Sequence, residues 1–391
     1  MPMSQMTRVG IVVELSTTWL GGLNYFRNLL RAIDESTDRH VEVVVFTGLR
    51  GDAQLAKDWP AEIVRHAMFD EGSPTWYTRK VLRRLCGFDP FAESLLRKHR
   101  IDVLSHSDYL GRRSRIPSLP WITDLQHHYL PEHFPARQVE RRNAYLRRLS
   151  REGAHLVVSS NVVKQDLVEQ FGVRSSHVDV LQFVSEAVPG NSLPTLDQLQ
   201  SRYSLPSRYI YVPNQFWSHK NHRAVIEAVG LLQKVGNEVF VVCTGRQDDN
   251  RDPAYFPALE TRLEQPDVRD RFRLLGVVPK QDVDALLLHC RFVINPSFFE
   301  GWSSTVEEAK AIGKHLLLSD IPVHREQAPA CSDYFDPSGH QALAKLIWAR
   351  WAAPDEPTNS VATDRHRTMH RQRRTEFAAT FSRIVTARAG R

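Results

Sequence analysis

Long apolar runs are missing from this sequence of 391 residues, which limits where the protein can work. No stretch approaches the roughly 18–20 consecutive apolar residues that a membrane-spanning helix requires. The first residues, MPMSQMTRVGIVVEL, do not combine a basic start with a long apolar segment, so they do not resemble a signal peptide. We therefore expect a cytoplasmic protein whose contact with a membrane, if it has one, is peripheral at the inner face.

Cysteine is scarce as well. The four cysteines lie at positions 86, 243, 290 and 331, and no two of them form a C-x-x-C pair. This pattern is typical of reduced structural thiols rather than of a redox or metal site. The sequence has no G-x-G-x-x-G fingerprint for a dinucleotide, and no Asp-x-Asp stands out as a metal site. We expect neither a cofactor nor a bound metal.

Acidic residues are in slight deficit, because 51 lysines and arginines face 45 aspartates and glutamates and leave a net charge of +6. The basic residues gather in residues 79–84, 137–151 and 365–374. In the middle stretch an apolar stripe lies among six arginines. That pattern suits a helix with a solvated face or a helix on an anionic membrane surface, and both interpretations stay open. No known nucleic-acid motif accompanies the charge, so we expect no nucleic-acid partner.

Length and patterning favour two α/β domains. A chain of 391 residues is too long for one compact core. Short apolar runs of strand type alternate with helical patterns through residues 8–183 and again through residues 208–319. Polar, proline-containing residues 185–206 separate the two series. We predict an α/β fold with two Rossmann-like domains, residues 1–190 and 191–362, facing each other across a cleft.

A turn between a strand and a helix, within residues 293–311, predicts an anion site. The apolar strand ends at Pro296, which cannot extend it, and a glycine turn leads into a polar helix start. Free N–H groups and the positive end of the helix dipole would then point at one place. The residues of that turn and helix start that would face the anion are Gly301, Ser303, Ser304 and Thr305.

Two carboxylates bracket the turn, since Glu300 precedes it and Glu308 lies eight positions later. Phosphate repels carboxylates, so these two are better suited to accept hydrogen bonds from sugar and ribose hydroxyls. The pattern EGWSSTVEEA resembles the E-x7-E motif of retaining GT-B glycosyltransferases, which use nucleotide sugars. The resemblance implies that Glu300 lies at the transferred sugar, Glu308 holds the ribose, and the turn binds the diphosphate. An ordinary turn with surface glutamates is the alternative for this motif alone.

Other loops extend the resemblance. Members of the family commonly place an arginine and, five residues on, a lysine against the diphosphate. This chain has Lys220 but carries Gln215 at the arginine position, which leaves neutralisation of the diphosphate to Lys220 and backbone N–H groups. Arg246, in the loop after the next predicted strand, is a further candidate. A family G-x-V turn that packs beneath the nucleobase corresponds to Gly276-Val277 and the residue after them. An ordinary turn between a strand and a helix, with a hydrophobic staple, is the alternative for this segment. Gly21-Gly22, near the start of an early helix, correspond to a loop that faces the cleft.

A second group of polar residues follows the predicted strand at residues 121–124. Polar groups at the carboxyl ends of parallel strands are where α/β proteins place their chemistry. The stretch WITDLQHHYLPEHF looks like a D-x-Q-H-x-x-x-P-E segment that lines the acceptor side of the cleft in a bacterial branch of the family. We therefore predict that Asp124 and His127 lie at the acceptor. Capping and loop packing are the alternative for His127 and His128.

The resemblance implies a retaining enzyme that moves a sugar from a nucleotide diphosphate sugar to an acceptor hydroxyl. The basic stretches favour a lipid-linked or cell-envelope glycan acceptor. GT-B chains often return their last helix to the first domain, which predicts that residues 363–391 pack there. A nucleotide-sugar epimerase and a noncatalytic binder of nucleotide sugars or polyanions remain alternatives. A hydrolase fits less well, because Glu300 and Glu308 are better placed to bind hydroxyls than to flank a scissile bond.

Overall fold

The chain forms two compact α/β units in the computed structural model, which describes residues 6–17, 20–37, 40–186, 193–249, 251–327, 329–354 and 360–389. Unit 1 comprises Met1–Leu125, Ala136–Val184 and Arg371–Arg391, and unit 2 comprises Gln126–Pro135 and Ser185–His370. The domain boundary suggested at residue 190 lies outside the described residues.

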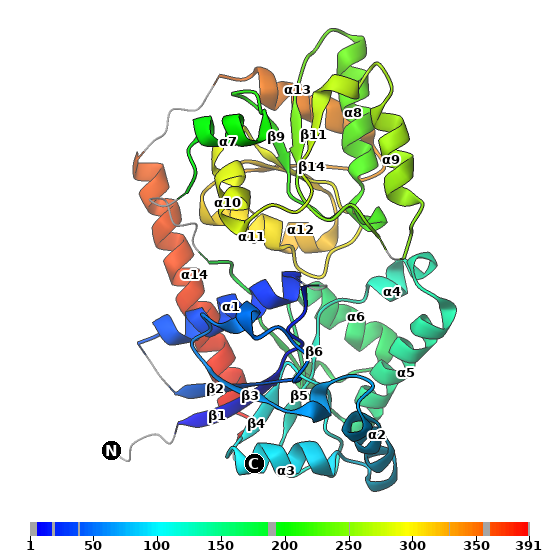
Figure 1. Ribbon diagram of the computed structural model, residues 1–391, viewed down its shortest axis with the longest axis vertical. Coiled ribbons are helices and arrows are strands. Elements are labelled where there is room, and N and C mark those ends of the chain that lie inside the picture. The colour runs from blue at the N-terminus through cyan, green and yellow to red at the C-terminus, as the bar shows by residue number, and fades with distance from the viewer. Residues whose placement is uncertain are drawn as a thin grey trace. The chain divides into compact units, whose positions relative to one another are not determined.

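Unit 1 is built on two parallel sheets, with strand orders β3-β2-β1-β4-β5 and β6-β7-β8 (Figure 1). The strands are β1 Thr7–Val12, β2 Val41–Thr47, β3 Glu62–Arg65, β4 Val103–Ser105, β5 Ser118–Leu119, β6 Trp121–Ile122, β7 Leu156–Val158 and β8 Val178–Val180. The helices are α1 Leu20–Glu35, α2 Pro74–Cys86, α3 Pro90–Lys98, α5 Ala136–Glu152, α6 Asn161–Phe171 and the part of α14 (Ser360–Thr386) that follows His370.

Unit 2 is built on one parallel sheet of six strands in the order β11-β10-β9-β12-β13-β14. Its strands are β9 Ile210–Val212, β10 Val241–Cys243, β11 Phe272–Leu274, β12 Val293–Asn295, β13 Leu316–Ser319 and β14 Ser332–Phe335. Its helices are α4 Gln126–Tyr129, α7 Leu196–Tyr203, α8 His222–Lys234, α9 Tyr255–Leu263, α10 Lys280–His289, α11 Ser304–Ala311, α12 Pro322–Gln327 and α13 His340–Ala352. This strand order is that of a doubly wound sheet, in which the order of the strands along the sheet reverses between β9 and β12.

Alternate residues of each central strand in unit 2 point to opposite faces, and helices bury both. Ile210 and Val212 pack into a core with α8 and α13, whereas Tyr209 and Tyr211 pack into a second core with α10 and α11. A strand that is covered on both faces consists of a continuous apolar run, so these strands can be predicted from the sequence. The predicted α/β fold with two Rossmann-like halves is confirmed.

Several elements differ from the expectation. Strands β3, β5 and β14 and helix α9 form where the sequence indicates no such element. Gly21 and Gly22 lie inside the first turn of α1 rather than in a loop before it. Short 3₁₀ turns occur at Ala53–Ala56, Ala67–Phe69, Pro131–His133, Ser175–His177, Ser218–Lys220 and Arg269–Arg271. None of the helices in the described ranges is both long and apolar enough to cross a membrane.

Candidate functional site

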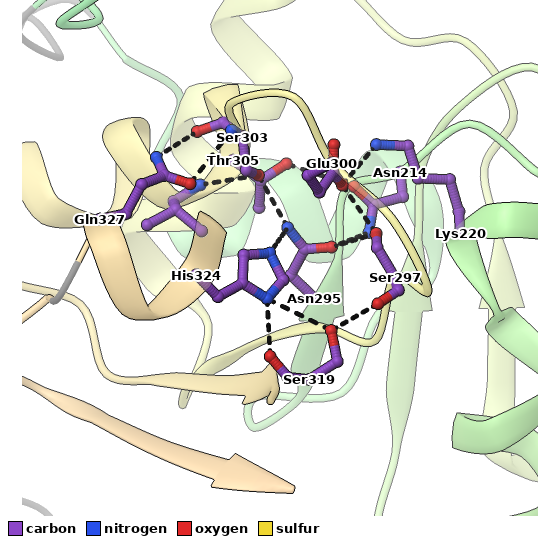
Figure 2. Close-up of polar contacts among 11 residues, drawn as sticks. Asn214, Lys220, Asn295, Ser297, Glu300, Ser303, Thr305, Ser319, His324 and Gln327 are labelled. Atoms are coloured by element: carbon purple, nitrogen blue, oxygen red, sulfur yellow. Dashed lines mark hydrogen bonds and ion pairs between the residues drawn. The ribbon is translucent and has the colours of Figure 1, made fainter. Parts of the chain in front are cut away.

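The loops that follow β9 and β12 leave the unit 2 sheet at the point where its winding reverses, and their first polar residues meet. Asn214 follows β9, Asn295 ends β12, and the Asn214 Nδ2 donates to Asn295 Oδ1 at 3.1 Å (Figure 2). Ligands of doubly wound sheets bind outside the carboxyl ends of the strands at such a switch point. The sequence analysis did not name either asparagine as a site residue, although each directly follows or ends an apolar strand.

A buried ion pair joins these two loops. Lys220 Nζ lies 2.6 Å from Glu300 Oε1, and the two side chains are 15% and 8% exposed. Ser297 Oγ donates to the same carboxylate oxygen at 2.7 Å. Burial alone would raise the pKa of Glu300, but the charge of Lys220 and the hydrogen bonds from Lys220 and Ser297 outweigh it, and the pKa is lowered. Glu300 is therefore an ionised acceptor at neutral pH. The structure brings together Lys220 and Glu300, which the sequence assigned to different parts of the donor.

The N-terminus of α11 lies at the end of the loop that carries Glu300. Ser303 caps the helix, since its Oγ accepts the N–H of Val306 at 3.4 Å and the Nδ2 of Asn295 at 2.7 Å. The backbone N–H of Ser303 donates to Gln327 Oε1 at 3.1 Å, so this donor, expected to face an anion, is already used. Ser304 and Thr305 are the first residues of the helix, and N–H groups in that position have no partner within a helix.

A fully buried histidine, His324, connects the end of β12 to the end of β13. His324 Nδ1 lies 2.8 Å from the carbonyl oxygen of Ser319 and donates to it, which leaves Nε2 to accept from Asn295 Nδ2 at 3.4 Å. Ser319 Oγ donates to the carbonyl of Ser297 at 2.5 Å. Burial lowers the pKa of His324, so its ring is neutral and serves as a fixed bridge. We assign His324 a positioning role.

The two adjacent glutamates of α11 have different surroundings. Glu307 is completely buried and accepts from Gln327 Nε2 at 3.0 Å. Glu308 is partly exposed and lies 3.3 Å from Lys280 Nζ at the start of α10. Burial by itself would lower the pKa of Lys280, but Glu308 and Asp284 raise it, so this lysine stays charged. Glu308 is thus the member of the pair that remains accessible to a ligand.

The turn before α10 is open to solvent. Gly276 has a φ of 65°, and a Cβ atom added there would meet nothing within 4 Å. The Val277 side chain is 62% exposed. Gly276 also accepts the N–H of Gly245 at 2.8 Å, which ties this turn to the loop after β10.

Gln215 supports a neighbouring arginine. Its Oε1 accepts the backbone N–H of Arg246 at 2.7 Å, and the Arg246 guanidinium pairs with Asp248 at 2.7 Å. The amide oxygen of Gln215 is therefore used inside the protein, and this side chain brings no charge to the site. Arg246 is the cation that Gln215 positions, although Asp248 neutralises it.

The residues predicted outside this loop cluster are placed as follows. Gly21 is exposed and Gly22 buried in the first turn of α1. Asp124 is partly buried and accepts from Thr123 Oγ1 at 3.1 Å. His127, in α4, is 2% exposed and packs edge-on against Phe134 with ring centroids 6.4 Å apart.

Asp282-Val283-Asp284 has the spacing of an Asp-x-Asp motif, but both of its carboxylates are ion-paired. Asp282 lies 2.6 Å from Arg202, and Asp284 pairs with Lys280. Within the described ranges, no group of three or more histidine, cysteine, aspartate or glutamate side chains is arranged to hold a metal ion.

Known families match the chain in two successive blocks. The family described as Glycosyltransferase Family 4 matches residues 21–182, and Glycosyl transferases group 1 matches residues 200–348. The chain is 23% identical over 227 residues to the O-antigen chain mannosyltransferase RfbU of Salmonella typhimurium. That match spans 58% of the length of either protein.

Solved structures share the fold. Anabaena Alr3699/HepE, in a complex with UDP, is 15% identical with a TM-score of 0.69, over 98% of this chain and 100% of that one. A glycosyltransferase from Rickettsia africae is 16% identical with a TM-score of 0.66, over 98% and 96%. Likeness at this identity establishes the GT-B fold, and the family matches cover both halves of the chain. The protein therefore belongs to the GT-B glycosyltransferases of group 1 and family 4.

Proposed function

We propose that the protein transfers a hexosyl group from a nucleoside diphosphate sugar to an acceptor hydroxyl, with retention at the anomeric carbon. The observation that carries this proposal is the buried Lys220–Glu300 pair. It lies at the switch point of a doubly wound sheet, in the two loops that lead to α8 and to the N-terminus of α11. A cation, two helix-start N–H groups and a carboxylate are the groups that a diphosphate linked to a sugar requires.

The donor would divide the ion pair. In the ligand-free arrangement the charge of Lys220 is neutralised by Glu300. A bound diphosphate would attract Lys220 and the N–H groups of Ser304 and Thr305, because charge-assisted hydrogen bonds to phosphate are short and strong. Glu300 would then accept hydrogen bonds from hydroxyls of the transferred sugar. Gly301 allows the backbone of the turn to approach the phosphates closely.

The nucleoside would lie on the other side of the diphosphate. Glu308 is the accessible carboxylate of α11 and would accept the ribose hydroxyls. The open turn at Gly276 and the exposed Val277 side chain would contact the base. Lys280 would hold Glu308 in place through its ion pair.

Departure of the nucleotide would be assisted by electrostatics. The positive charge of Lys220 and the aligned N–H groups stabilise the negative charge that develops on the leaving phosphate. That phosphate would then take the proton of the acceptor hydroxyl, so no side-chain nucleophile is needed. Asp124 and His127 are proposed at the acceptor. We propose that no metal takes part, because the chain supplies the charge itself.

The acceptor is proposed to be a cell-envelope glycan or a lipid-linked precursor. RfbU is named for O-antigen chain synthesis, and a structurally similar protein, WaaG, is described as a glycosyltransferase involved in lipopolysaccharide biosynthesis. HepE binds UDP and UDP-glucose, which supports a nucleoside diphosphate sugar as the donor here.

A thermal-shift panel with UDP, GDP, dTDP and their sugars tests the donor site. One bound nucleotide at a hundredfold excess over its Kd should stabilise the fold by about 2.7 kcal/mol. We expect nucleotides that carry one of the three bases to stabilise the protein, and we expect Glu308→Ala to abolish that stabilisation. Glu260→Ala, which removes an exposed carboxylate from α9 in the same unit, is the matched control and should respond like the native chain.

The result also separates the alternative functions. Absence of stabilisation by any nucleoside diphosphate would contradict the donor site. An epimerase would convert the sugar of the donor without any acceptor, which chromatography of the nucleotide sugars would detect. A noncatalytic binder would still bind the nucleotide after Glu300→Gln and would never release it from its sugar.

A further inference from the structure

Helix α2 (Pro74–Cys86) is folded with its apolar side toward solvent. It is capped at both ends by its own neighbours, since Ser73 Oγ accepts the N–H of Trp76 at 3.1 Å and Gly87 ends the helix with a φ of 77°. None of its 13 residues is buried. A helix on the surface of a globular protein normally turns an apolar stripe to the core, so α2 departs from the usual arrangement.

The side of α2 that faces unit 1 is basic. Arg79 pairs with the buried Asp89 at 2.8 Å and donates to the carbonyl of Met68 at 2.8 Å. Arg83, one turn further on, donates to the carbonyl of Tyr109 and lies 3.7 Å from Asp108. These contacts fix the rotation of the helix, because both arginines must point inward.

The outward side of α2 is apolar. Tyr77, Val81 and Leu85 follow one another at a spacing of four residues and are 58%, 58% and 75% exposed. Residues four apart lie one above the other on a helix, so the three side chains form one stripe. Figure 1 shows α2 at the edge of unit 1.

Exposed positive charge runs beside that stripe. Lys80 and Arg84 are exposed and lie next to Val81 and Leu85, and α2 contains no acidic residue. The Lys80 ammonium is 3.2 Å from the ring centroid of Trp76, one turn earlier on the same helix, which is a cation–π contact. A basic amphipathic helix with aromatic residues at its edge has the composition of helices that lie in a lipid interface.

We propose that α2 docks the protein on an anionic lipid bilayer. Tyr77, Val81 and Leu85 enter the boundary between headgroups and acyl chains, and Lys80 and Arg84 bind lipid phosphates. Helix α5 does not offer this surface, although its sequence is equally basic: Leu146 and Leu149 are buried in the core, which leaves a solvated charged face. This proposal does not depend on the identity of the sugar donor.

Co-sedimentation of the full chain with large vesicles tests the proposal. We expect binding to phosphatidylcholine vesicles that contain 30% phosphatidylglycerol, little binding to phosphatidylcholine alone, and loss of binding at high salt. Replacing Lys80 and Arg84 by alanine should weaken partitioning onto these vesicles about 30-fold. Each cation near an anionic surface raises the partition coefficient about five- to six-fold. Val81→Asp with Leu85→Asp should reduce it below detection.

Matched controls keep the test specific. Arg137→Ala with Arg141→Ala removes two exposed arginines four apart on α5, and Val235→Asp places a charge at an apolar site that is 70% exposed in unit 2. Both should bind vesicles like the native chain, and far-UV circular dichroism should show that every variant is folded. Equal vesicle binding by the α2 variants and the native chain would overturn the proposal. The proposal would also be overturned if the native chain did not bind vesicles but bound an immobilised acidic protein through α2.

Discussion

Lys220 and Glu300 neutralise one another across 80 positions of sequence. Each is a conventional donor-site residue by its motif, and neither motif indicates that the two side chains touch. The pairing means that the ligand-free site is not a bare positive pocket. Its positive charge is neutralised in an ion pair, and a more strongly charged ligand can separate the two side chains.

Removing one member of this pair should be costly. Lys220→Ala leaves the buried Glu300 carboxylate without its cation, and we expect a loss of about 3 kcal/mol in the free energy of unfolding. The double variant with Glu300→Gln should be more stable than the sum of the two single changes by at least about 1 kcal/mol. Urea unfolding of the four proteins measures this coupling.

A lysine in an exposed pair is the control for that cycle. Lys234 is 66% exposed and lies 4.0 Å from Asp267, so Lys234→Ala should change stability by less than about 0.5 kcal/mol. Strict additivity of the Lys220 and Glu300 changes would show that the pair is not coupled. All variants that lack Lys220 or Glu300 should lose sugar transfer.

For single residues, the sequence predicts which residues belong to the site better than it predicts which side chains they contact. The spacing of the motif selects Glu308 rather than Glu307, and the structure buries Glu307 while leaving Glu308 accessible. The partners of these side chains are less visible, because Lys280 and Gln327 belong to other elements and carry no motif of their own. Side chains that meet only through tertiary packing leave no local pattern to read.

The first turn of α11 depends on α12. Gln327, at the end of α12, accepts the N–H of Ser303 at 3.1 Å and donates to the carbonyl of Ser303 and to Glu307, both at 3.0 Å. One amide thus satisfies three groups of the helix start. The orientation of the Ser304 and Thr305 N–H groups follows from this contact rather than from α11 alone.

Gln327→Ala should therefore loosen the anion site. It leaves a buried N–H and a buried carboxylate with fewer partners, and we expect a loss of about 2–3 kcal/mol. Gln165→Ala, which removes an exposed hydrogen bond to Glu169 in α6, should cost less than about 0.5 kcal/mol. Urea unfolding and nucleotide titration measure both effects. Unchanged nucleotide affinity in a folded Gln327→Ala protein would contradict the dependence of α11 on α12.

The strands that the sequence does not indicate are peripheral. β3, β5 and β14 are the outermost strands of their sheets. β3 has no buried residue, and three of the four residues of β14 are only partly buried. An edge strand packs on fewer neighbours, so it lacks the continuous apolar run that marks a buried parallel strand.

Acid should destabilise both units through buried neutral histidines. Burial lowers the pKa of His106 in unit 1 and of His222 in unit 2 to about 3. Below an unfolded pKa of about 6.5 the unfolded chain binds protons that the native chain does not, so stability is complete above that pH and is lost as the pH falls. Each of these two histidines should contribute a loss of about 2 kcal/mol between pH 7 and pH 5.

Calorimetry at pH 7, 6 and 5 measures this loss. His222 stacks on Phe216 with ring centroids 4.1 Å apart, so His222→Phe keeps an aromatic ring and removes the titration. We expect the melting temperature of this variant to fall less steeply with pH than that of the native chain. An identical pH dependence would show that carboxylates such as Glu300, which act at lower pH, account for the acid response.

Unit 1 is assembled from chain segments that are synthesised before and after most of unit 2. Residues 371–391 belong to unit 1, and Phe377, Phe381 and Ile384 of α14 are buried there. During synthesis the earlier part of unit 1 must therefore wait, with apolar surface uncovered, while all of unit 2 emerges. Unit 2 needs no later segment and can fold first. Emergence of residues 371–391, rather than emergence of the first half, is the event that completes unit 1.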